Sequence, residues 1–433
     1  MIIPSIDIQE GRAVQLRGGA FPTLDVGDPI ELAARLSRVG EIAVVDLDAA
    51  RGRGDNRSIV EKIVRSWPTR VGGGIRTRED ALRLLDLGAR RIMIGTMAEP
   101  AFLDGLPAER IVAALDTRDG EILVEGWTKG TGRRVEERMA ELAPYVGGFL
   151  ATFIEREGRL GGLDLERARK LVAAAKGVRV TFAGGATEAS EIAELDRLGA
   201  DVQAGTAIAT GKLSLAEAFA APLRSDRPDG LWPTIVCDES GRALGLVYSS
   251  LDSLKAALDS GSGVYHSRSR GLWVKGEESG NVQDLLRVEA DCDRDALRFV
   301  VRQAGAGFCH LGTFSCFGDS AGLERLERTI AGRMLDAPPG SYTRKLLDDP
   351  SFLGSKLREE AAELARAESP AEAASEAADV VYFALTKLAA MGARLADVEA
   401  ELDRRSLKVT RRGGAAKSAY RQDGEDLAWT GLH

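Results

Sequence analysis

Short apolar runs alternate with amphipathic segments over roughly the first 222 residues of the chain. Nearly continuous apolar runs predict parallel strands buried on both faces at 43–47, 91–94, 111–115, 148–152 and 178–182. Apolar residues at helical spacing predict helices between them at 79–87 and 188–198. Both helices run into Leu-Gly-Ala, and glycine suits the C-terminal end of a helix. The alternation predicts an α/β domain.

The pattern changes twice after this region. Residues 224–230 form a polar join that contains proline and glycine, and short strands and turns follow it. A second join falls near Gly318, and long alanine-rich helices are expected from Phe352 to about Lys408. We therefore expect a multidomain protein with domains at 1–222, 229–318 and 322–412, followed by a weakly periodic tail at 413–433.

The first domain contains an internal repeat. Asp7, Gly73 and Gly95 recur as Asp116, Gly184 and Gly205, at separations of 109, 111 and 110 residues. A duplicated unit with an acid at one strand end and glycines at two others predicts a (β/α)8 TIM barrel. Both acids and both glycine loops would then share one face of the barrel.

Glycine after a strand lets backbone N–H groups approach a phosphate without interference from a Cβ atom. One glycine pair alone is more often a tight turn, and one aspartate alone more often a helix cap or salt-bridge partner, but the common offset favours a paired site. The first 222 residues contain no histidine, so acid–base chemistry there depends on carboxylates. The predicted phosphate-binding residues are Gly73, Gly74, Gly95 and Thr96 in one half, and Gly184, Gly185, Gly205 and Thr206 in the other.

Composition and charge narrow the class of protein. The net charge of −8 arises from mixed signs without a basic block, which disfavours nucleic-acid binding. No stretch approaches about 18 apolar residues, so no membrane span is expected. The N-terminus lacks the charged start and long apolar run of a signal peptide. We expect a cytoplasmic protein, whose four cysteines are metal ligands or free thiols rather than disulfides.

The first domain resembles phosphoribosylformimino-AICAR-phosphate isomerase, a barrel enzyme of histidine biosynthesis. The resemblance rests on the segments 2–7, 45–48, 72–76, 115–118 and 126–127. It implies an Amadori rearrangement of an aminoaldose to an aminoketose, with Asp7 as general base, Asp116 as general acid and Thr152 assisting. Two carboxylates in unlike surroundings can divide those roles.

The sequence departs from the family pattern at two places. The family's Thr-Asp-x-x-x-Asp-Gly reads Thr-Phe-Ile-Glu-Arg-Glu-Gly at 152–158, which removes an acid expected to orient Thr152. The family's Gly-Arg-Ala reads Gly-Thr-Ala at 205–207. The lost acid after Thr152 motivates one alternative to the isomerase, a non-catalytic scaffold that binds phosphates. A second alternative is a barrel that also accepts phosphoribosylanthranilate in tryptophan synthesis.

The middle domain carries a candidate metal centre. Cys292, Cys309 and Cys316 are separated by 17 and 7 residues, and three thiolates without a fourth suggest a catalytic zinc with one open position. Alternating acids would share one face of a strand and offer hard oxygen ligands to magnesium at Asp291, Asp293 and Asp295. The alternative is free thiols in a core strand beside a solvated acidic turn. Cys237 is expected to pack within a strand.

This domain resembles phosphoribosyl-AMP cyclohydrolase, on the segments 230–233, 267–270, 272–277 and 279–281. The resemblance implies a small, mainly-β, metal-binding domain that opens the adenine ring by hydrolysis, with zinc-bound hydroxide as the attacking group. It also implies that zinc is completed across a dimer interface, where Cys292 meets Cys309 and Cys316 of the partner subunit. His310 is a candidate proton carrier.

The C-terminal domain carries two pairs of acids at i,i+3 spacing, Glu360 with Glu363 and Glu376 with Asp379. Each pair shares a helix face, so two facing helices could hold magnesium and a pyrophosphate. Glu359 and Glu360 taken alone would favour a solvated acidic face. Asp379, which runs directly into the apolar segment 380–385, argues against that interpretation for the set, and no role is predicted for Glu359. The domain resembles phosphoribosyl-ATP pyrophosphohydrolase, which implies an all-α, MazG-like fold that releases pyrophosphate by magnesium-activated water.

The three resemblances name consecutive steps of one pathway, so the sequence predicts a trifunctional enzyme of histidine biosynthesis. Its expected substrates are phosphoribosyl-ATP, phosphoribosyl-AMP and ProFAR, and its expected cofactors are Zn²⁺ and Mg²⁺. The two C-terminal domains together imply a homodimer or a larger assembly.

Overall fold

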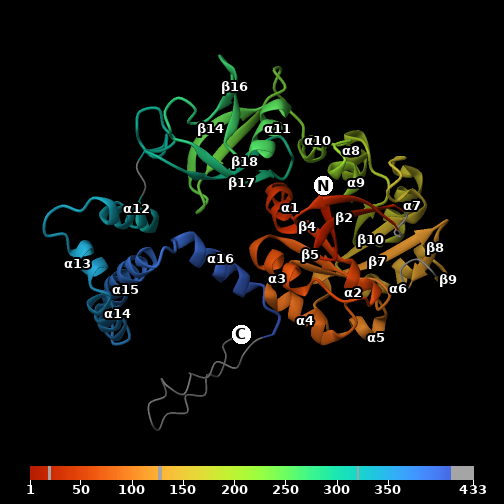
Figure 1. The fold of residues 1–433 in the computed structure, drawn as a ribbon, viewed down its shortest axis with the longest axis horizontal. Coiled ribbons are helices and arrows are strands. Elements are labelled where there is room, and N and C mark those ends of the chain that lie inside the picture. Colours follow the sequence, from red (N-terminus) through yellow and green to blue (C-terminus); the bar gives the residue numbers. More distant parts are fainter. Residues whose placement is uncertain (18–20, 125–128, 319–320, 411–433) are drawn as a thin grey trace, which may run out of the picture.

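The computed structural model describes residues 1–17, 21–124, 129–318 and 321–410, which form a barrel, a curled sheet and a helical region (Figure 1). The motif residues Gly126 and Trp127 and the tail at 413–433 lie outside the described residues. None of the helices within the described ranges is long and apolar enough to cross a membrane.

The N-terminal region is a closed barrel of eight parallel strands, as the sequence predicted. The pairing of β7 with β10 closes the ring. In order around it, the strands are β1 (Ile2–Gln9), β4 (Ile42–Asp46), β5 (Thr69–Gly72), β6 (Arg91–Ile94), β7 (Ile111–Arg118), β10 (Gly148–Phe153), β11 (Arg179–Ala183) and β12 (Asp201–Ala204).

The two halves of the barrel repeat the same elements. β1 is followed by the hairpin strands β2 (Arg12–Arg17) and β3 (Phe21–Gly27), and β7 by β8 (Glu121–Val124) and β9 (Lys129–Arg134). In each half the first hairpin strand runs antiparallel to the barrel strand before it. β1 therefore corresponds to β7 and β6 to β12, which confirms the internal duplication.

Helices surround the barrel strands. The helix predicted at 79–87 is α4, which begins after Thr77, whose side chain accepts a hydrogen bond from Asp80 N, and ends at Gly88 with φ +117°. The helices of this region are α1 (Pro29–Leu36), α2 (Leu47–Arg51), α3 (Arg57–Ser66), α4 (Arg78–Leu87), α5 (Pro100–Leu103), α6 (Val135–Leu142), α7 (Leu165–Ala174), α8 (Ala189–Arg197), α9 (Thr206–Ala209) and α10 (Leu215–Ala220).

The middle region is a six-stranded sheet in the order β16-β15-β14-β13-β18-β17, with helix α11 (Leu251–Ser260) packed beside β15. Cys237 is buried in β13, as expected. The strands are β13 (Trp232–Cys237), β14 (Ala243–Ser249), β15 (Val264–Ser267), β16 (Gly271–Val274), β17 (Gln283–Ala290) and β18 (Leu297–Gln303).

The expectation that residues 291–295 alternate along a strand is wrong. These residues form the loop between β17 and β18, and Arg294 adopts a positive φ of +67°. The chain reverses direction here, because β17 and β18 are antiparallel neighbours.

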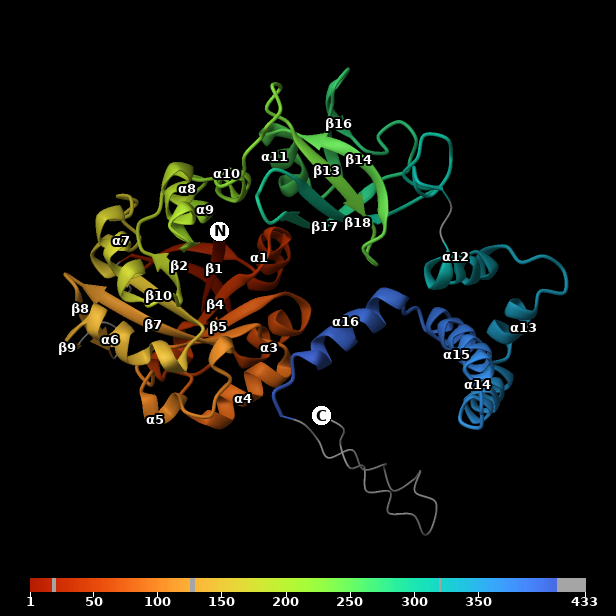
Figure 2. The ribbon, with the colours of Figure 1, turned by 180° about the vertical axis from the view of Figure 1, so that it is seen from behind.

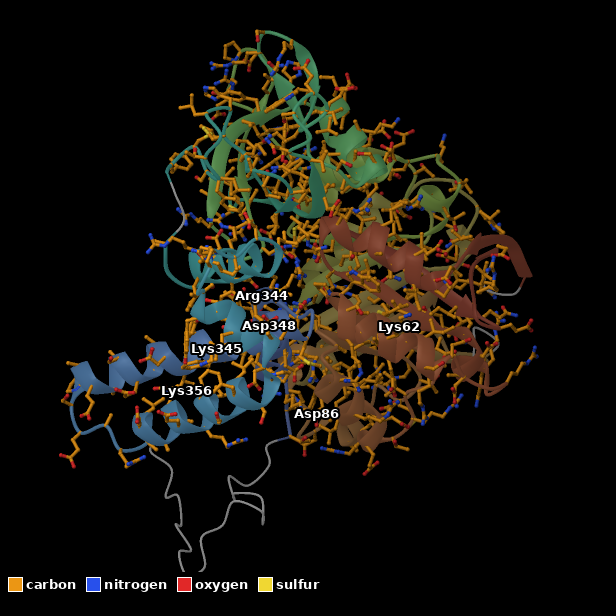
Figure 3. All side chains as sticks on the ribbon, turned by 60° about the vertical axis from the view of Figure 1, so that its left-hand side comes forward. Lys62, Asp86, Arg344, Lys345, Asp348 and Lys356 are labelled. Carbon is orange, nitrogen blue, oxygen red and sulfur yellow. The ribbon has the colours of Figure 1, made fainter. Side chains whose placement is uncertain are left out.

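The C-terminal region is helical, and α14 and α15 lie side by side in Figure 3. Leu346, Leu353 and Phe383 form its buried apolar centre. The helices are α12 (Gly322–Leu335), α13 (Tyr342–Asp348), α14 (Pro350–Leu364), α15 (Pro370–Ala390) and α16 (Leu395–Ser406), which fulfils the prediction of long helices between 352 and 408.

The chain then returns to the barrel, and Figure 2 shows α16 leading back toward α3 and α4. Asp86 at the end of α4 accepts hydrogen bonds from Val409 N at 2.9 Å and Thr410 N at 3.0 Å. Arg110 donates to the backbone oxygen of Leu407 at 3.0 Å. The helical region is therefore attached to the barrel at its far end.

Candidate active sites

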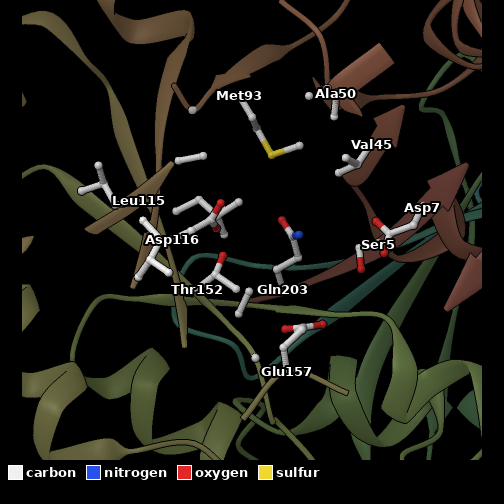
Figure 4. Close-up of a pocket in the computed structure, with 18 of the residues that line it drawn as sticks. Ser5, Asp7, Val45, Ala50, Met93, Leu115, Asp116, Thr152, Glu157 and Gln203 are labelled. Atoms are coloured by element: carbon white, nitrogen blue, oxygen red, sulfur yellow. The ribbon is translucent and has the colours of Figure 1, made fainter. Parts of the chain in front are cut away.

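A cavity of about 1100 Å³ opens at the carboxyl ends of the barrel strands. Asp7, Asp116 and Thr152 line it (Figure 4). All eight predicted phosphate-binding residues of the two halves line it as well. Asp116 on β7 lies directly across the ladder from Thr152 on β10. Parallel strands present their carboxyl ends at one face, so residues far apart in sequence meet around this cavity.

The glycine loops of the two halves have matching geometry. Gly73 has φ +94°, and a Cβ atom there would lie 2.2 Å from the backbone oxygen of Asp46. Gly184 has φ +90°, and a Cβ atom there would lie 2.6 Å from the backbone oxygen of Phe153. Each loop passes so close to the preceding strand end that a side chain would not fit, and the backbone stays open toward the cavity.

Burial changes the acidity of the cavity's carboxyls. It raises the pKa of Asp7 from 3.8 to about 6, although the positive charge of Arg51 acts in the opposite direction. A third carboxyl, Glu157, also lines the cavity. Burial, and after it the charges of Asp7 and Asp116, raise the pKa of Glu157 from 4.5 to about 8. At neutral pH, Glu157 is mostly protonated while Asp7 is mostly ionised.

Glu157 was missed in the sequence, although a signal for it existed. Phe153 replaces the first acid of the family's Thr-Asp-x-x-x-Asp-Gly pattern, but an acid remains at the position of the second one, as Glu157 before Gly158. Phe153 is fully buried in the core, where its ring lies 5.8 Å from that of Phe182. Although the acid after Thr152 is lost, the cavity therefore still contains Glu157 beside Asp7 and Asp116.

Cys309 and Cys316, two of the three candidate zinc ligands, lie next to each other. Hydrogen bonds from Thr313 and the Leu311 N–H lower the pKa of the Cys309 thiol, while burial and the neighbouring Cys309 raise that of Cys316. Desolvation lowers the pKa of the buried Lys275, and the neighbouring Cys316 and Cys309 partly oppose this lowering. A pair of adjacent thiols beside a cation suits thiolate coordination of zinc.

Cys292 lies in the exposed β17–β18 loop, and within the described residues it forms no close group with Cys309 and Cys316. One subunit therefore does not assemble the three thiols, and their meeting across a dimer stays a prediction. His310 is exposed and follows Cys309 directly.

The β17–β18 loop gathers the three acids that the sequence singled out. Oxygen atoms of Asp291, Asp293 and Asp295 lie within 4.8 Å of one another. Asp291 Oδ1 accepts hydrogen bonds from the N–H groups of Asp295 at 3.0 Å and Ala296 at 3.2 Å, so it also holds the turn together. The turn, rather than a strand face, brings the acids together, and this set of oxygens fits a hard cation.

In the helical region, α14 and α15 bring Glu360, Glu363 and Glu376 within the same 4.8 Å limit. Desolvation, followed by repulsion from Glu363, Asp379 and Glu360, raises the pKa of Glu376. Asp379 is thus an electrostatic neighbour, although it lies outside the closest group. Glu359 is exposed and pairs with Lys356 at 2.8 Å, which suits a solvated helix face.

A closed (β/α)8 barrel with acids and glycine loops around one cavity, joined to a sheet region and a helical region, places the chain among multidomain barrel proteins. Residues 1–214 match the family described as histidine biosynthesis protein, and the chain belongs to this family. Residues 245–318 match phosphoribosyl-AMP cyclohydrolase, and residues 323–406 match phosphoribosyl-ATP pyrophosphohydrolase.

Three relatives illustrate the similarity. A histidine biosynthesis trifunctional protein of Neurospora crassa is 39% identical over 353 residues, which is 79% of this chain and 37% of the relative. A histidine biosynthesis bifunctional protein of Schizosaccharomyces pombe is 49% identical over 215 residues, 50% of this chain and 52% of the relative. An isomerase of a doubly phosphoribosylated imidazole-4-carboxamide from Methanothermobacter thermautotrophicus is 38% identical over 51% of this chain and 97% of the relative.

The chain spans 37% and 25% of the first two trifunctional relatives, from N. crassa and Komagataella pastoris.

Proposed function

We propose that the chain catalyses three consecutive steps of histidine biosynthesis. The helical domain removes pyrophosphate from phosphoribosyl-ATP, the middle domain opens the adenine ring of phosphoribosyl-AMP, and the barrel isomerises ProFAR to PRFAR. The three matched families, which lie in succession along the chain, support this assignment. For the barrel, the decisive observation is one cavity lined by both repeated acids and both glycine loops.

The barrel chemistry needs a base at C2 of the sugar and a donor for ring opening. Asp7, with its pKa of about 6, is ionised at neutral pH and serves as the base. Asp116 is the proposed acid, and it lies beside Thr152 on the neighbouring strand. Glu157 adds a neutral carboxyl that can donate a hydrogen bond at pH 7. Two carboxyls of one cavity, Asp7 and Glu157, held in unlike states favour catalysis over the scaffold alternative.

The proposed metals match the donor atoms available. Cys309 and Cys316, with Cys292 of the partner subunit, would hold zinc, which supplies an acidified water for ring opening. His310 follows Cys309 and is the proposed proton carrier. The oxygen clusters at 291–295 and on α14 and α15 would hold magnesium, which binds phosphate oxygens.

The remaining assignments are also proposals. The domain boundaries are 1–222, 229–318 and 322–412. The cyclohydrolase family match begins only at residue 245, but β13 precedes that residue and lies in the interior of the middle sheet, which supports the earlier start. A shared zinc requires at least a homodimer. The substrates are small phosphoribosyl compounds, and neither nucleic acid nor membrane is a proposed partner. The cytoplasmic location stays a prediction.

The test is to supply the whole protein with phosphoribosyl-ATP, Mg²⁺ and Zn²⁺ and to follow the intermediates by chromatography. We expect pyrophosphate, then the ring-opened ProFAR, then PRFAR. Accumulation of ProFAR would show an inactive barrel and support the scaffold alternative. Offering phosphoribosylanthranilate in a parallel reaction decides whether the barrel also serves tryptophan synthesis.

A further inference from the structure

One polar side chain stands out on the floor of the barrel cavity. Gln203 lies on β12, directly across the ladder from Ile3 on β1. The layer of side chains that fills the barrel at this level is apolar and includes Ile3, Ala43, Met93, Val112, Leu150 and Ala183. The amide oxygen of Gln203 is buried and accepts no hydrogen bond from the described residues.

An unpartnered buried polar atom destabilises the free protein, so its presence needs an explanation. Gln203 lines the cavity, so a molecule bound there could supply the missing donor. Figure 4 places Gln203 near the middle of the cavity, between Asp116 and Thr152 on one side and Ser5 and Asp7 on the other. In this view the amide lies between the two repeated acids rather than beside one of them.

The internal repeat gives Gln203 a counterpart. Gly95 and Gly205 are equivalent residues of the two halves, so Gln203, two residues before Gly205, corresponds to Met93. Both side chains line the cavity and approach its middle from opposite sides in Figure 4. The two halves thus offer similar glycine loops but a different residue at the centre: an amide on one side and a thioether on the other.

We propose that Gln203 is a specificity-determining residue that fixes which way round a substrate with two phosphates lies in the barrel. Its amide oxygen accepts a hydrogen bond from an N–H donor in the nitrogenous middle part of that substrate. Two similar phosphate loops alone would admit the molecule in either direction, and one direction alone places the reacting sugar beside Asp7. This inference rests on the proposed isomerase function of the barrel.

The test compares the full-length wild type with Gln203→Met, which installs the side chain of the equivalent position. We expect kcat/KM for ProFAR isomerisation to fall about tenfold, equivalent to about 1.4 kcal/mol for one lost buried hydrogen bond. Saturating substrate should not restore the wild-type kcat, because part of the substrate then lies reversed in the cavity.

Two readouts separate this role from a merely structural one. The unliganded variant should melt at the wild-type temperature or above it, because an unpartnered polar atom has been removed. Inorganic phosphate, used as a competitive inhibitor, should keep its inhibition constant, because the glycine loops are unaltered. Pyrophosphate release and ring opening by the same polypeptide serve as internal controls and should be unchanged.

An unchanged kcat/KM in the variant overturns the role of Gln203, and so does a lowered melting temperature with a parallel loss of phosphate inhibition. If the wild type itself fails to isomerise ProFAR, the proposed function of the barrel fails, and this inference fails with it. The two failures are distinguishable because the first leaves wild-type turnover intact.

Discussion

Replacing Glu157 with glutamine tests whether this carboxyl is neutral when the barrel is folded. Its pKa is raised from 4.5 to about 8 by burial and by the charges of Asp7 and Asp116. A raised pKa in the folded state means that protonation favours folding, so this carboxyl contributes full stability below about pH 4.5 and loses it as the pH rises through about 8. At about 1.4 kcal/mol per pKa unit, the complete loss is about 5 kcal/mol.

Glutamine has nearly the same shape and does not titrate. Between pH 5 and pH 8, wild-type Glu157 loses about 3 to 4 kcal/mol of this stability, whereas the variant loses none. We therefore expect the stability of Glu157→Gln relative to the wild type to rise by about 3 to 4 kcal/mol across this interval. The gain should become smaller when Asp7→Asn is added, because one of the charges that raises the pKa is then absent.

Hydrogen exchange of the full-length protein, followed by mass spectrometry on peptides from β10 and β11, measures the free energy of opening in the barrel alone. Glu166→Gln is the matched control, because Glu166 is exposed on α7 and pairs with Lys170 at 3.0 Å. A difference between Glu157→Gln and the wild type that stays constant from pH 5 to pH 8 would refute the reasoning.

The same carboxyls shape the pH dependence of isomerisation. We expect kcat/KM to rise as Asp7 ionises near pH 6 and to fall as Glu157 ionises near pH 8. Because the two carboxyls interact, the apparent pKa values of this profile belong to the pair rather than to either residue. In Glu157→Gln the alkaline fall near pH 8 should disappear. An unchanged alkaline fall would show that Glu157 does not govern it.

Four further outcomes are expected. Asp7→Asn should lower isomerase turnover about 10²- to 10⁴-fold and leave the two hydrolytic steps intact, as product analysis from phosphoribosyl-ATP would reveal. Cys316→Ser should lower the zinc content of the purified protein and stop ring opening while pyrophosphate release continues; full zinc retention would contradict the ligand assignment. Glu376→Gln should raise the magnesium concentration needed for pyrophosphate release at least about tenfold, whereas Glu359→Gln should have little effect, and equal effects would argue against the cluster. Asp86→Asn should weaken the attachment of Val409 and Thr410 by about 1–2 kcal/mol, seen as faster hydrogen exchange at 407–410; unaltered exchange would argue against that contact.

The barrel and its two repeated acids could be predicted because their signals are local and periodic. Apolar runs located the strands, and the common offset of Asp7 and Asp116 implied that they share one face. Glu157 escaped prediction because its place in the cavity depends on the turn after β10, which a motif comparison at Phe153 does not describe. Its raised pKa depends on two acids from other strands, and no sequence pattern contains that information.

The metal-binding candidates show a different limit. The grouping of Asp291, Asp293 and Asp295 was anticipated, but for the wrong reason, because the hairpin turn and its backbone hydrogen bonds replaced the expected strand. Cys292 shows what a single chain cannot specify, since its proposed partners belong to another subunit. Gln203 was overlooked because a lone amide in a strand carries no signal until its surroundings are known.

The chain leaves the barrel for the middle sheet and returns to the barrel through α16 and residues 407–410. The helical domain is held covalently through the middle domain at one end and by Asp86 and Arg110 at the other. A protease cut between the middle and helical regions would therefore leave the helical fragment bound to the barrel through non-covalent contacts, such as those of Asp86 and Arg110. Two anchors limit sliding or rotation of the helical region more than one would, so α14 and α15 are expected to move over a narrower range than a region joined to the barrel by a single linker.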